Sequence, residues 1–393
     1  MAVQEQVFGF FIPTVTLMGV GAHKEIGNQI KVLGGTKPFI CTDKGITAAG
    51  IADRVAAVIK AECEVEPVIY DGTHPNPTDN NVHEGYDMYK ASGCDLIVSL
   101  GGGSAHDCGK GIGIIATNGG NIRDYEGVDK SSSAMPPFIA VNTTAGTASE
   151  MTRFCIITDT SRKVKMAIVD WRVTPNVAID DPLLMVGMPP ALTAATGMDA
   201  LTHAVEACLG IQKNPISDAV AASAIRLIFN NLVEAVRNGK NLQARLGMAN
   251  AATLAGIAFS NSMVTMVHAI GHSLGAVCHL PHGDAMAICL PDVLEFNLDA
   301  IGQDLGELLL PMAGATEYVQ TPESQRGARV IEKIRELRKT LHDLSGLPIT
   351  LKEAGVSEDK MSAVAEISPK DGAAFYNRKK FTAVDALAVL KKM

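Results

Sequence analysis

The 393-residue sequence is poor in aromatic side chains, which make up 5% of it and include a single tryptophan. Together with 37 glycines, this balance favours an α/β protein with many tight turns over a β-sandwich. A basic stripe is also missing, because lysine and arginine are scattered and the formal net charge is -8. Nucleic acids are bound largely by neutralising their phosphates, so a nucleic acid partner is not expected.

The eight cysteines contain no C-x-x-C pair, which predicts reduced and mostly buried thiols rather than a disulfide framework. The first residues lack the basic and apolar regions of a secretion signal. No uninterrupted apolar run approaches the roughly 20 residues that span a bilayer. These absences predict a cytoplasmic protein that does not associate with membranes.

The chain changes character near Gly187–Pro190, and two domains are predicted, residues 1–187 and 188–393. In the first, apolar runs alternate with helical patterns, which predicts an α/β domain with a parallel, Rossmann-like sheet covered on both faces. The expected strands are Pro38–Thr42, Val65–Tyr70, Asp95–Leu100 and Phe138–Asn142, with a β-hairpin of Cys155–Thr158 and Lys165–Val169. The expected helices are Gly45–Ala61, Asn80–Ser92 and Ala105–Thr117.

The second domain is predicted to be all-helical, because helical periodicity continues while strand signals nearly vanish. Its expected helices are Ala191–Leu209, Pro215–Gly239, Asn241–Ser260, Met263–Val277, His282–Asn297 and Gly327–Ser345. The polar stretch Ala315–Gln325 contains a proline and is expected to be a surface loop.

A glycine turn, Gly101-Gly-Gly-Ser104, follows the apolar strand that ends at Leu100. Such a turn lets backbone N–H groups approach a pyrophosphate, and the helix that follows favours negative charge at its N-terminus. His106 stands where the G-x-G-x-x-G fingerprint has its last glycine. The motif alone is therefore equally compatible with an ordinary tight turn.

Three further features favour nucleotide binding. Asp43 ends an early strand, where a carboxylate can accept hydrogen bonds from ribose hydroxyls and repel a 2′-phosphate; this favours NAD over NADP, although the residue is also suited to cap a helix. The run from Thr143 to Glu150 places hydroxyls and a glycine after another strand, either for phosphate and ribose or as local caps. Lys165 is either a further contact of this kind or a solvated lysine.

The second domain concentrates imidazoles, with five of the 10 histidines between residues 203 and 282. Asp199 and His203 are four residues apart and share a helix face, although such a pair by itself is more often hydrogen-bonded or solvated than metal-bound. One carboxylate and three imidazoles suit divalent iron, zinc or manganese. Spacing does not decide which of the later histidines are ligands; the candidates are His268, His272, His279 and His282.

Several motifs occur in a characteristic order: the glycine turn, Thr143-Thr-Ala-Gly-Thr-Ala-Ser-Glu150, Gly197-Met-Asp-Ala-Leu-Thr-His203, and His268-x3-His272-x9-His282-Gly283. In this combination the sequence resembles the iron-containing (group III) alcohol dehydrogenases over essentially its whole length, above all the bacterial methanol, ethanol and 1,3-propanediol dehydrogenases. The resemblance implies NAD(H)-dependent interconversion of a primary alcohol and its aldehyde by metal-assisted hydride transfer. It also implies an active site between an α/β nucleotide domain and an all-α metal domain.

Carried over by position, the resemblance implies that Fe2+, or Zn2+ or Mn2+ in its place, is held by Asp199, His203, His268 and His282. His272 would handle the proton near the substrate, and His279 would be structural. The implied NAD contacts are Asp43, Asn76, Gly102, Gly103, Ser104, Thr143, Thr144, Thr147, Phe154, Lys165, and Pro182, Leu184 and Val186 within the segment Pro182–Val186.

Two positions depart from the pattern of the family. Asp284 follows Gly283, where relatives often have a small or apolar residue, and Asn377 is followed by Arg378-Lys-Lys380, where many relatives have Asn-Pro beside the substrate cleft. The cations raise the alternative of an anionic short aldehyde of the sulfoacetaldehyde or semialdehyde type, although a solvated basic cluster is preferred. Non-redox dehydroquinate-synthase-like or merely metal-binding relatives are further alternatives.

The assembly is expected to be a homodimer or a larger homo-oligomer. The apolar segment Phe8–Pro13 near the N-terminus would suit strand exchange between two copies of the chain.

Overall fold

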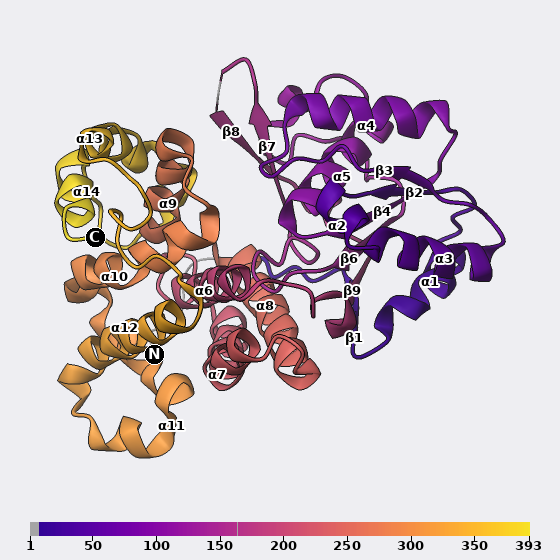
Figure 1. Cartoon of the computed structure of the whole chain (residues 1–393). Helices are drawn as coiled ribbons and strands as arrows, with labels where there is room; N and C mark the ends of the chain where they lie inside the picture. Colours follow the sequence, from indigo (N-terminus) through magenta and orange to yellow (C-terminus); the bar gives the residue numbers. More distant parts are fainter. Residues whose placement is uncertain (1–7, 163) are drawn as a thin grey trace. The chain divides into compact units, whose positions relative to one another are not determined.

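The computed structural model describes residues 8–162 and 164–393. The chain forms two compact units, which are coloured along the sequence in Figure 1. One comprises Pro13–Gly187, and we call it the sheet unit. The other comprises Met188–Met393 with residues 8–12, and we call it the helical unit.

A parallel six-stranded sheet forms the centre of the sheet unit, with strand order β1-β9-β6-β4-β2-β3. Its strands are β1 (Val15–Met18), β2 (Pro38–Cys41), β3 (Val68–Tyr70), β4 (Leu96–Gly101), β6 (Phe138–Asn142) and β9 (Val177–Asp180). The four strands expected from sequence are confirmed, whereas β1 and β9 were not predicted. They pair with each other through residues far apart in the chain, Val15 with Val177 for example, and local sequence does not show such a pairing.

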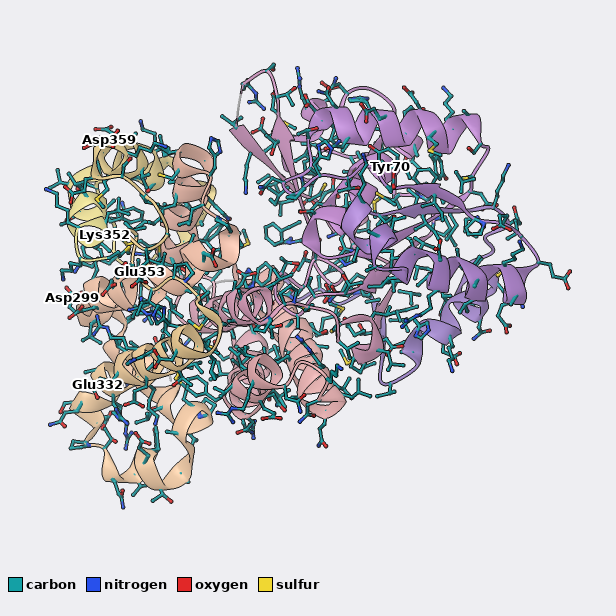
Figure 2. All side chains as sticks on the ribbon, in the orientation of Figure 1. Tyr70, Asp299, Glu332, Lys352, Glu353 and Asp359 are labelled. Atoms are coloured by element: carbon teal, nitrogen blue, oxygen red, sulfur yellow. The ribbon has the colours of Figure 1, made fainter. Side chains whose placement is uncertain are left out.

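Helices cover both faces of this sheet (Figure 1). On β2, Phe39 packs in a core with α4 (Asp79–Ala91) and α5 (Gly103–Asn118), while its neighbour Ile40 packs in a second core with α1 (Ile26–Val32) and α3 (Ile51–Cys63). Tyr70, labelled in Figure 2, stacks on Phe39 with ring centroids 6.3 Å apart. Because successive strand residues face opposite sides, an unbroken apolar strand is buried on both. The predicted Rossmann-like α/β class is confirmed.

The order of the strands creates a position for a ligand at the carboxyl edge of the sheet. β3 lies on one side of β2, and β4, which follows it in sequence, lies on the other. Open α/β sheets bind ligands outside the carboxyl ends of strands where the winding direction reverses in this way. Here β2 is followed by Asp43, and β4 ends in the glycine turn.

The remaining elements of the sheet unit are short. β7 (Phe154–Asp159) and β8 (Val164–Val169) form the expected antiparallel hairpin, and β5 (Gly127–Val128) pairs with β8. The helix expected at Gly45–Ala61 is interrupted at Gly50, whose φ is 70°, so that α2 (Lys44–Ala48) precedes α3. Short helical turns complete the unit: η1 (Ala22–Glu25), η2 (Ile122–Tyr125), η3 (Trp171–Val173) and η4 (Pro182–Leu184).

The helical unit is built almost wholly from helices, as expected. They are α6 (Pro190–Ala207), α7 (Pro215–Arg237), α8 (Leu242–Ser262), α9 (Met266–Cys278), α10 (His282–Glu307), α11 (Leu309–Gln320), α12 (Glu323–Ser345), α13 (Glu358–Ile367) and α14 (Ala383–Leu390), with the turns η5 (Ser368–Lys370) and η6 (Gly372–Tyr376). By length and composition alone α7 could cross a membrane, and the bent pair α8 and α9 could count as a second span. Core helices meet the same test, and α7 packs against α6 and α8.

The prediction of a surface loop at Ala315–Gln325 is wrong, because α11 and α12 include most of these residues. Polarity here marks solvated helix faces: Glu317 on α11 accepts a hydrogen bond from Arg329 on α12 at 2.7 Å. Pro322 is the N-cap residue of α12, a place at the start of a helix where its missing N–H has no cost.

Candidate metal centre and nucleotide site

Asp199 and His203 lie one turn apart on α6, which begins with Pro190 at its first position. Proline is favoured there because its fixed φ suits a helix and its N–H is not needed. The four-residue spacing places both side chains on one face of the helix, and they are buried, with exposures of 2% and 5%.

His268 lies near the start of α9, and His282 is the first residue of α10. Between them the chain reverses at His279, which ends α9 in the left-handed conformation with a φ of 57°. Pro281 then precedes α10 as its N-cap residue. His279 is exposed and is the C-cap residue of α9 at this turn.

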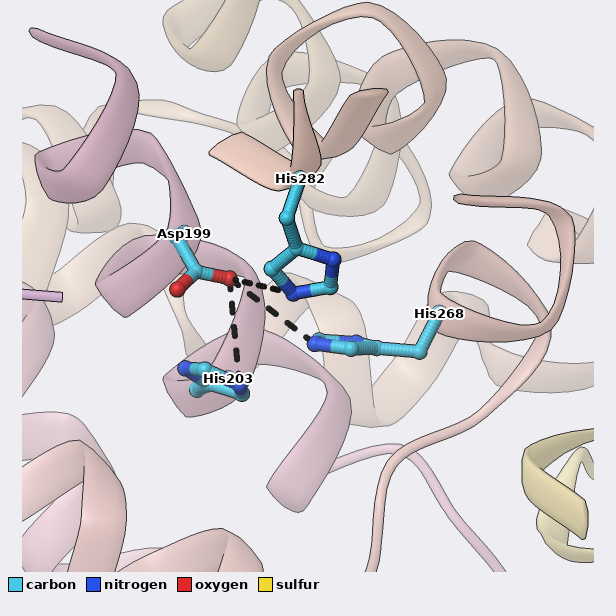
Figure 3. A group of neighbouring side chains, drawn as sticks. All are labelled: Asp199, His203, His268 and His282. Carbon is cyan, nitrogen blue, oxygen red and sulfur yellow. Dashed lines mark ion pairs between the residues drawn. The ribbon is translucent and has the colours of Figure 1, made fainter. Parts of the chain in front are cut away.

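The four predicted ligand residues converge from three helices (Figure 3). Their donor atoms all lie within 4.8 Å of one another. Asp199 Oδ1 is 3.3 Å from His282 Nε2, 3.8 Å from His203 Nε2 and 3.9 Å from His268 Nε2. Phe259 stacks on the His203 ring at 4.1 Å between centroids and packs it in place.

The protonation states of this cluster suit a cation. Burial lowers the pKa of His203 to about 3 and that of His268 well below its usual value, so both rings are neutral and keep a lone pair. Burial by itself raises the pKa of Asp199, but the neighbouring His203 and His282 outweigh it and lower the pKa overall. One carboxylate and neutral imidazoles form the mixed donor set that divalent iron, zinc or manganese accepts.

Two of the donor atoms are buried without a hydrogen-bond partner in the described part of the chain: Asp199 Oδ1 and His268 Nε2. Leaving such atoms unpaired costs free energy, on the order of 1–3 kcal/mol for each neutral group and more for a charged one. A divalent cation at the point where they meet would remove that cost. The donor set therefore fits the metal that the sequence motifs indicate.

The cluster is closed on one side and accessible on the other. The side chains of Asp199, His203 and His268 are at most 6% exposed, whereas that of His282 is 30% exposed. His272, one turn after His268, is 33% exposed, and its ring centroid lies 5.6 Å from those of His268 and His282. The solvent-exposed part of this histidine group is therefore formed by His272 and His282.

Two carboxylates at this site were not assigned from sequence. Glu206 contacts His268 Nδ1, and Asp371 Oδ2 lies 3.1 Å from His272 Nδ1. Burial raises the pKa of Glu206 to about 7, whereas the hydrogen bonds from Thr265 and Val267 act in the opposite direction and favour the charged carboxylate. Burial acts in the same direction on Asp371, but the His272 imidazole lowers the pKa of that carboxyl overall.

A signal existed for Glu206, which lies seven residues after Asp199 and so on the same face of α6. Asp371 is 99 residues from His272 and offered no such signal.

In the sheet unit, the glycine turn is held tightly against the loop after β6. A Cβ atom at Gly102 would lie 2.9 Å from Thr144 Cγ2, and one at Gly103 would lie 2.8 Å from Thr147 Oγ1. Gly102 is the N-cap residue of α5, so the backbone N–H groups of Gly103 and Ser104 have no acceptor within the helix. The close packing explains why both positions are glycine.

Other predicted contacts lie around this turn. The backbone N–H of Asn76 donates to Ser104 Oγ at 3.3 Å, and that of Thr143 donates to the Gly101 carbonyl at 2.9 Å. Asp43 caps α2 by accepting from the N–H groups of residues 45 and 46 through Oδ1. Capping uses Oδ1 alone, so it is compatible with a ribose contact through Oδ2.

The last predicted contacts lie on the hairpin and after β9. Phe154 begins β7, and Lys165 on β8 is paired with Thr158, where burial lowers its pKa. Pro182 and Leu184 form η4 after β9, and Val186 follows them. Leu184 packs in the core beneath the sheet, so only its backbone is free for a ligand.

A doubly wound sheet with a glycine turn and a carboxylate–imidazole cluster in a separate helical unit together define the architecture of a metal- and nucleotide-dependent dehydrogenase. The family model described as "Iron-containing alcohol dehydrogenase" matches residues 13–182, and "Fe-containing alcohol dehydrogenase family, C-terminal" matches residues 193–393. The chain belongs to the iron-containing alcohol dehydrogenase family.

Curated relatives match nearly the full length. The 1,3-propanediol dehydrogenase of Citrobacter freundii is 45% identical over 95% of this chain and 96% of its own. The NAD-dependent methanol dehydrogenase of Bacillus methanolicus is 40% identical over 97% and 98%. The crystal structure of a 1,3-propanediol oxidoreductase superimposes with a TM-score of 0.94 at 43% identity, over 98% of this chain and 100% of that one. These matches do not favour the non-redox alternative.

Proposed function

We propose that this chain interconverts a short, uncharged primary alcohol and its aldehyde with NAD(H) and a divalent cation. Fe2+ is the preferred cation, and Zn2+ or Mn2+ are the alternatives. The observation that supports this most directly is the convergence of Asp199 Oδ1 and His268 Nε2, which are buried without a hydrogen bond, with two further imidazoles. When bound, the cation would supply Lewis acidity worth several kcal/mol in lowering the pKa of the alcohol hydroxyl, and NAD would supply the hydride acceptor.

The proposed ligands are Asp199, His203, His268 and His282. Asp199, His203 and His268 are buried and would hold the cation together with His282, which is the partly exposed member of the set. A divalent cation held by a single carboxylate would keep a net positive charge at the centre, which would favour the deprotonated alcohol over the neutral one.

His272 is proposed to take the proton that the alcohol hydroxyl loses. Its Nδ1 faces Asp371, whose other oxygen is held by the N–H of Ala373 at 2.8 Å. A carboxylate at Nδ1 favours the tautomer whose Nε2 is free to accept a proton. The same arrangement returns the proton when an aldehyde is reduced.

NAD is proposed to bind at the carboxyl edge of the parallel sheet. The backbone of Gly102 and Gly103, with Ser104, would contact the pyrophosphate, and Asp43 the ribose. The proposed set is completed by Asn76, Thr143, Thr144, Thr147, Phe154, Lys165, Pro182, Leu184 and Val186. The printed name of the methanol dehydrogenase relative supports the choice of NAD.

The cationic run near the C-terminus supports an uncharged substrate. Arg378 pairs with Asp304, and Lys379 lies 2.9 Å from both carboxylate oxygens of Asp299. Both cations are thus balanced by carboxylates of α10 and have little charge left for an anionic aldehyde. The names of the relatives, which act on propanediol and methanol, agree with this choice.

A cytoplasmic homodimer or larger homo-oligomer is the proposed state. β1 is an edge strand of the sheet, and its Val15 and Met18 are 57% and 40% exposed. An exposed apolar edge invites pairing with a second copy. All eight cysteines are free thiols, as expected in a reducing compartment.

The test is NADH absorbance with a panel of short alcohols and aldehydes, in the presence of Fe2+, Zn2+ or Mn2+. Oxidation of NADH with neutral short aldehydes is expected, and sulfonated or carboxylated aldehydes should react more slowly. No absorbance change with any substrate and metal would overturn the proposal.

A further inference from the structure

Glu206 connects the two helices that carry three of the proposed metal ligands. It lies on α6, three residues after His203, and is fully buried. Its Oε2 contacts Nδ1 of His268 on α9. Its Oε1 accepts from Thr265 Oγ1 at 2.5 Å and from the Val267 N–H at 2.8 Å.

Glu206 also caps the N-terminus of α9, where the N-cap residue makes no side-chain cap of its own. Thr265 is the N-cap residue of α9, yet its side chain donates to Glu206 instead of capping the helix. Val267 is the second residue of α9, so its N–H has no acceptor within the helix. Glu206 accepts from it and places negative charge where the helix dipole favours it.

The contact determines which nitrogen of His268 is free. With Oε1 already accepting two hydrogen bonds, Oε2 is left to accept a hydrogen bond from the Nδ1–H of His268. His268 Nε2 then keeps its lone pair, which is directed toward Asp199 at 3.9 Å, where the donor atoms converge. A carboxylate behind a ligating imidazole fixes its tautomer and ring orientation and raises its basicity.

We infer that Glu206 is the positioning residue of the metal centre, which caps α9 from α6 and presents His268 Nε2 to the cation. The inference rests on the proposed metal set. It predicts that loss of the Glu206 charge weakens metal binding even where the chain remains folded.

The test measures the Zn2+ affinity of the full-length apo protein by competition with a chelator, and the visible absorption of the Co2+ form. Glu206→Gln keeps the size of the side chain and an oxygen for Val267, but presents an amide to His268. We expect Zn2+ affinity about 10–100-fold lower and a changed Co2+ spectrum. Asp170→Asn, which alters a buried carboxylate of the sheet unit bonded to Ser131, is the matched control and should leave both unchanged.

Wild-type Zn2+ affinity and an unchanged Co2+ spectrum in folded Glu206→Gln would overturn the inference, because Glu206 would then only cap α9. If Glu206→Gln does not fold, Thr265→Val is the second variant, because it removes one hydrogen bond to Glu206 Oε1 and keeps the carboxylate. We expect a smaller loss of Zn2+ affinity for this variant. An unchanged Zn2+ affinity would equally overturn the inference. A wild-type protein that binds no Zn2+, Co2+ or Fe2+ would instead contradict the proposed function itself.

Discussion

In the sheet unit the proposed phosphate contacts are mainly backbone groups at the ends of strands, whereas in the helical unit the proposed metal ligands are side chains from three helices. Backbone N–H groups are available at almost every residue, so phosphate binding by the glycine turn depends on the conformation of the turn and not on particular side chains. Close packing against Thr144 and Thr147 leaves no space for a Cβ atom there. A metal site needs particular donor atoms at one point. Substitutions should therefore have graded effects in the sheet unit and near-complete effects in the helical unit.

The largest effect is expected for His268→Ala. It removes a donor that is 2% exposed, and metal binding should be lost with a roughly thousandfold fall in kcat/KM, since Lewis acidity is worth several kcal/mol. Metal content by elemental analysis and turnover of NADH are the measurements. Circular dichroism should show an intact fold, and unchanged metal content and activity would remove His268 from the site.

A smaller effect within the same unit is expected for His272→Ala. Loss of a proton acceptor should lower kcat about a hundredfold without changing metal content, because general acid–base catalysis contributes on that order. Asp371→Asn should lower kcat less, since the imidazole remains but loses the acceptor at Nδ1. A loss of bound metal in either variant would show that the division between ligands and proton handling is wrong.

For the sheet unit, Gly103→Ala introduces a Cβ atom 2.8 Å from Thr147 Oγ1 and should disturb the turn. The KM for NAD should rise about tenfold, which corresponds to about 1.4 kcal/mol of binding, while metal content stays at the wild-type level. Steady-state kinetics at varied NAD checks this. Loss of metal in Gly103→Ala would mean that the glycine turn and the metal centre do not act independently.

The smallest effect is expected for Asp43→Gly. Losing the cap of α2 to glycine should cost only a few tenths of a kcal/mol, so the melting temperature should hardly change. Without the carboxylate, the ratio of kcat/KM for NAD to that for NADP should fall several-fold. An unaltered ratio would leave Asp43 as a helix cap alone.

Most of the fold followed from periodicity. The strand Pro38–Cys41 and the first four residues of the strand Phe138–Asn142 are continuous apolar runs, which a sheet buried on both faces requires. The interpretation failed where polarity was taken for irregular structure, at residues 315–325, because a helix pair joined by Glu317 and Arg329 can be polar on its outer face. The short strand β1 was missed since its pairing with β9 joins residues more than 150 positions apart.

By itself the sequence determined the two kinds of domain and the chemistry available to each: glycines after a strand, and a carboxylate and imidazoles at helical spacing. Only the tertiary structure decided which of those groups meet. It brought His268 and His282 to Asp199, left His279 at an exposed helix end, and placed Glu206 and Asp371 behind two imidazoles. The reason is physical: spacing defines the face of one helix, whereas contact between helices depends on packing between residues far apart in the chain.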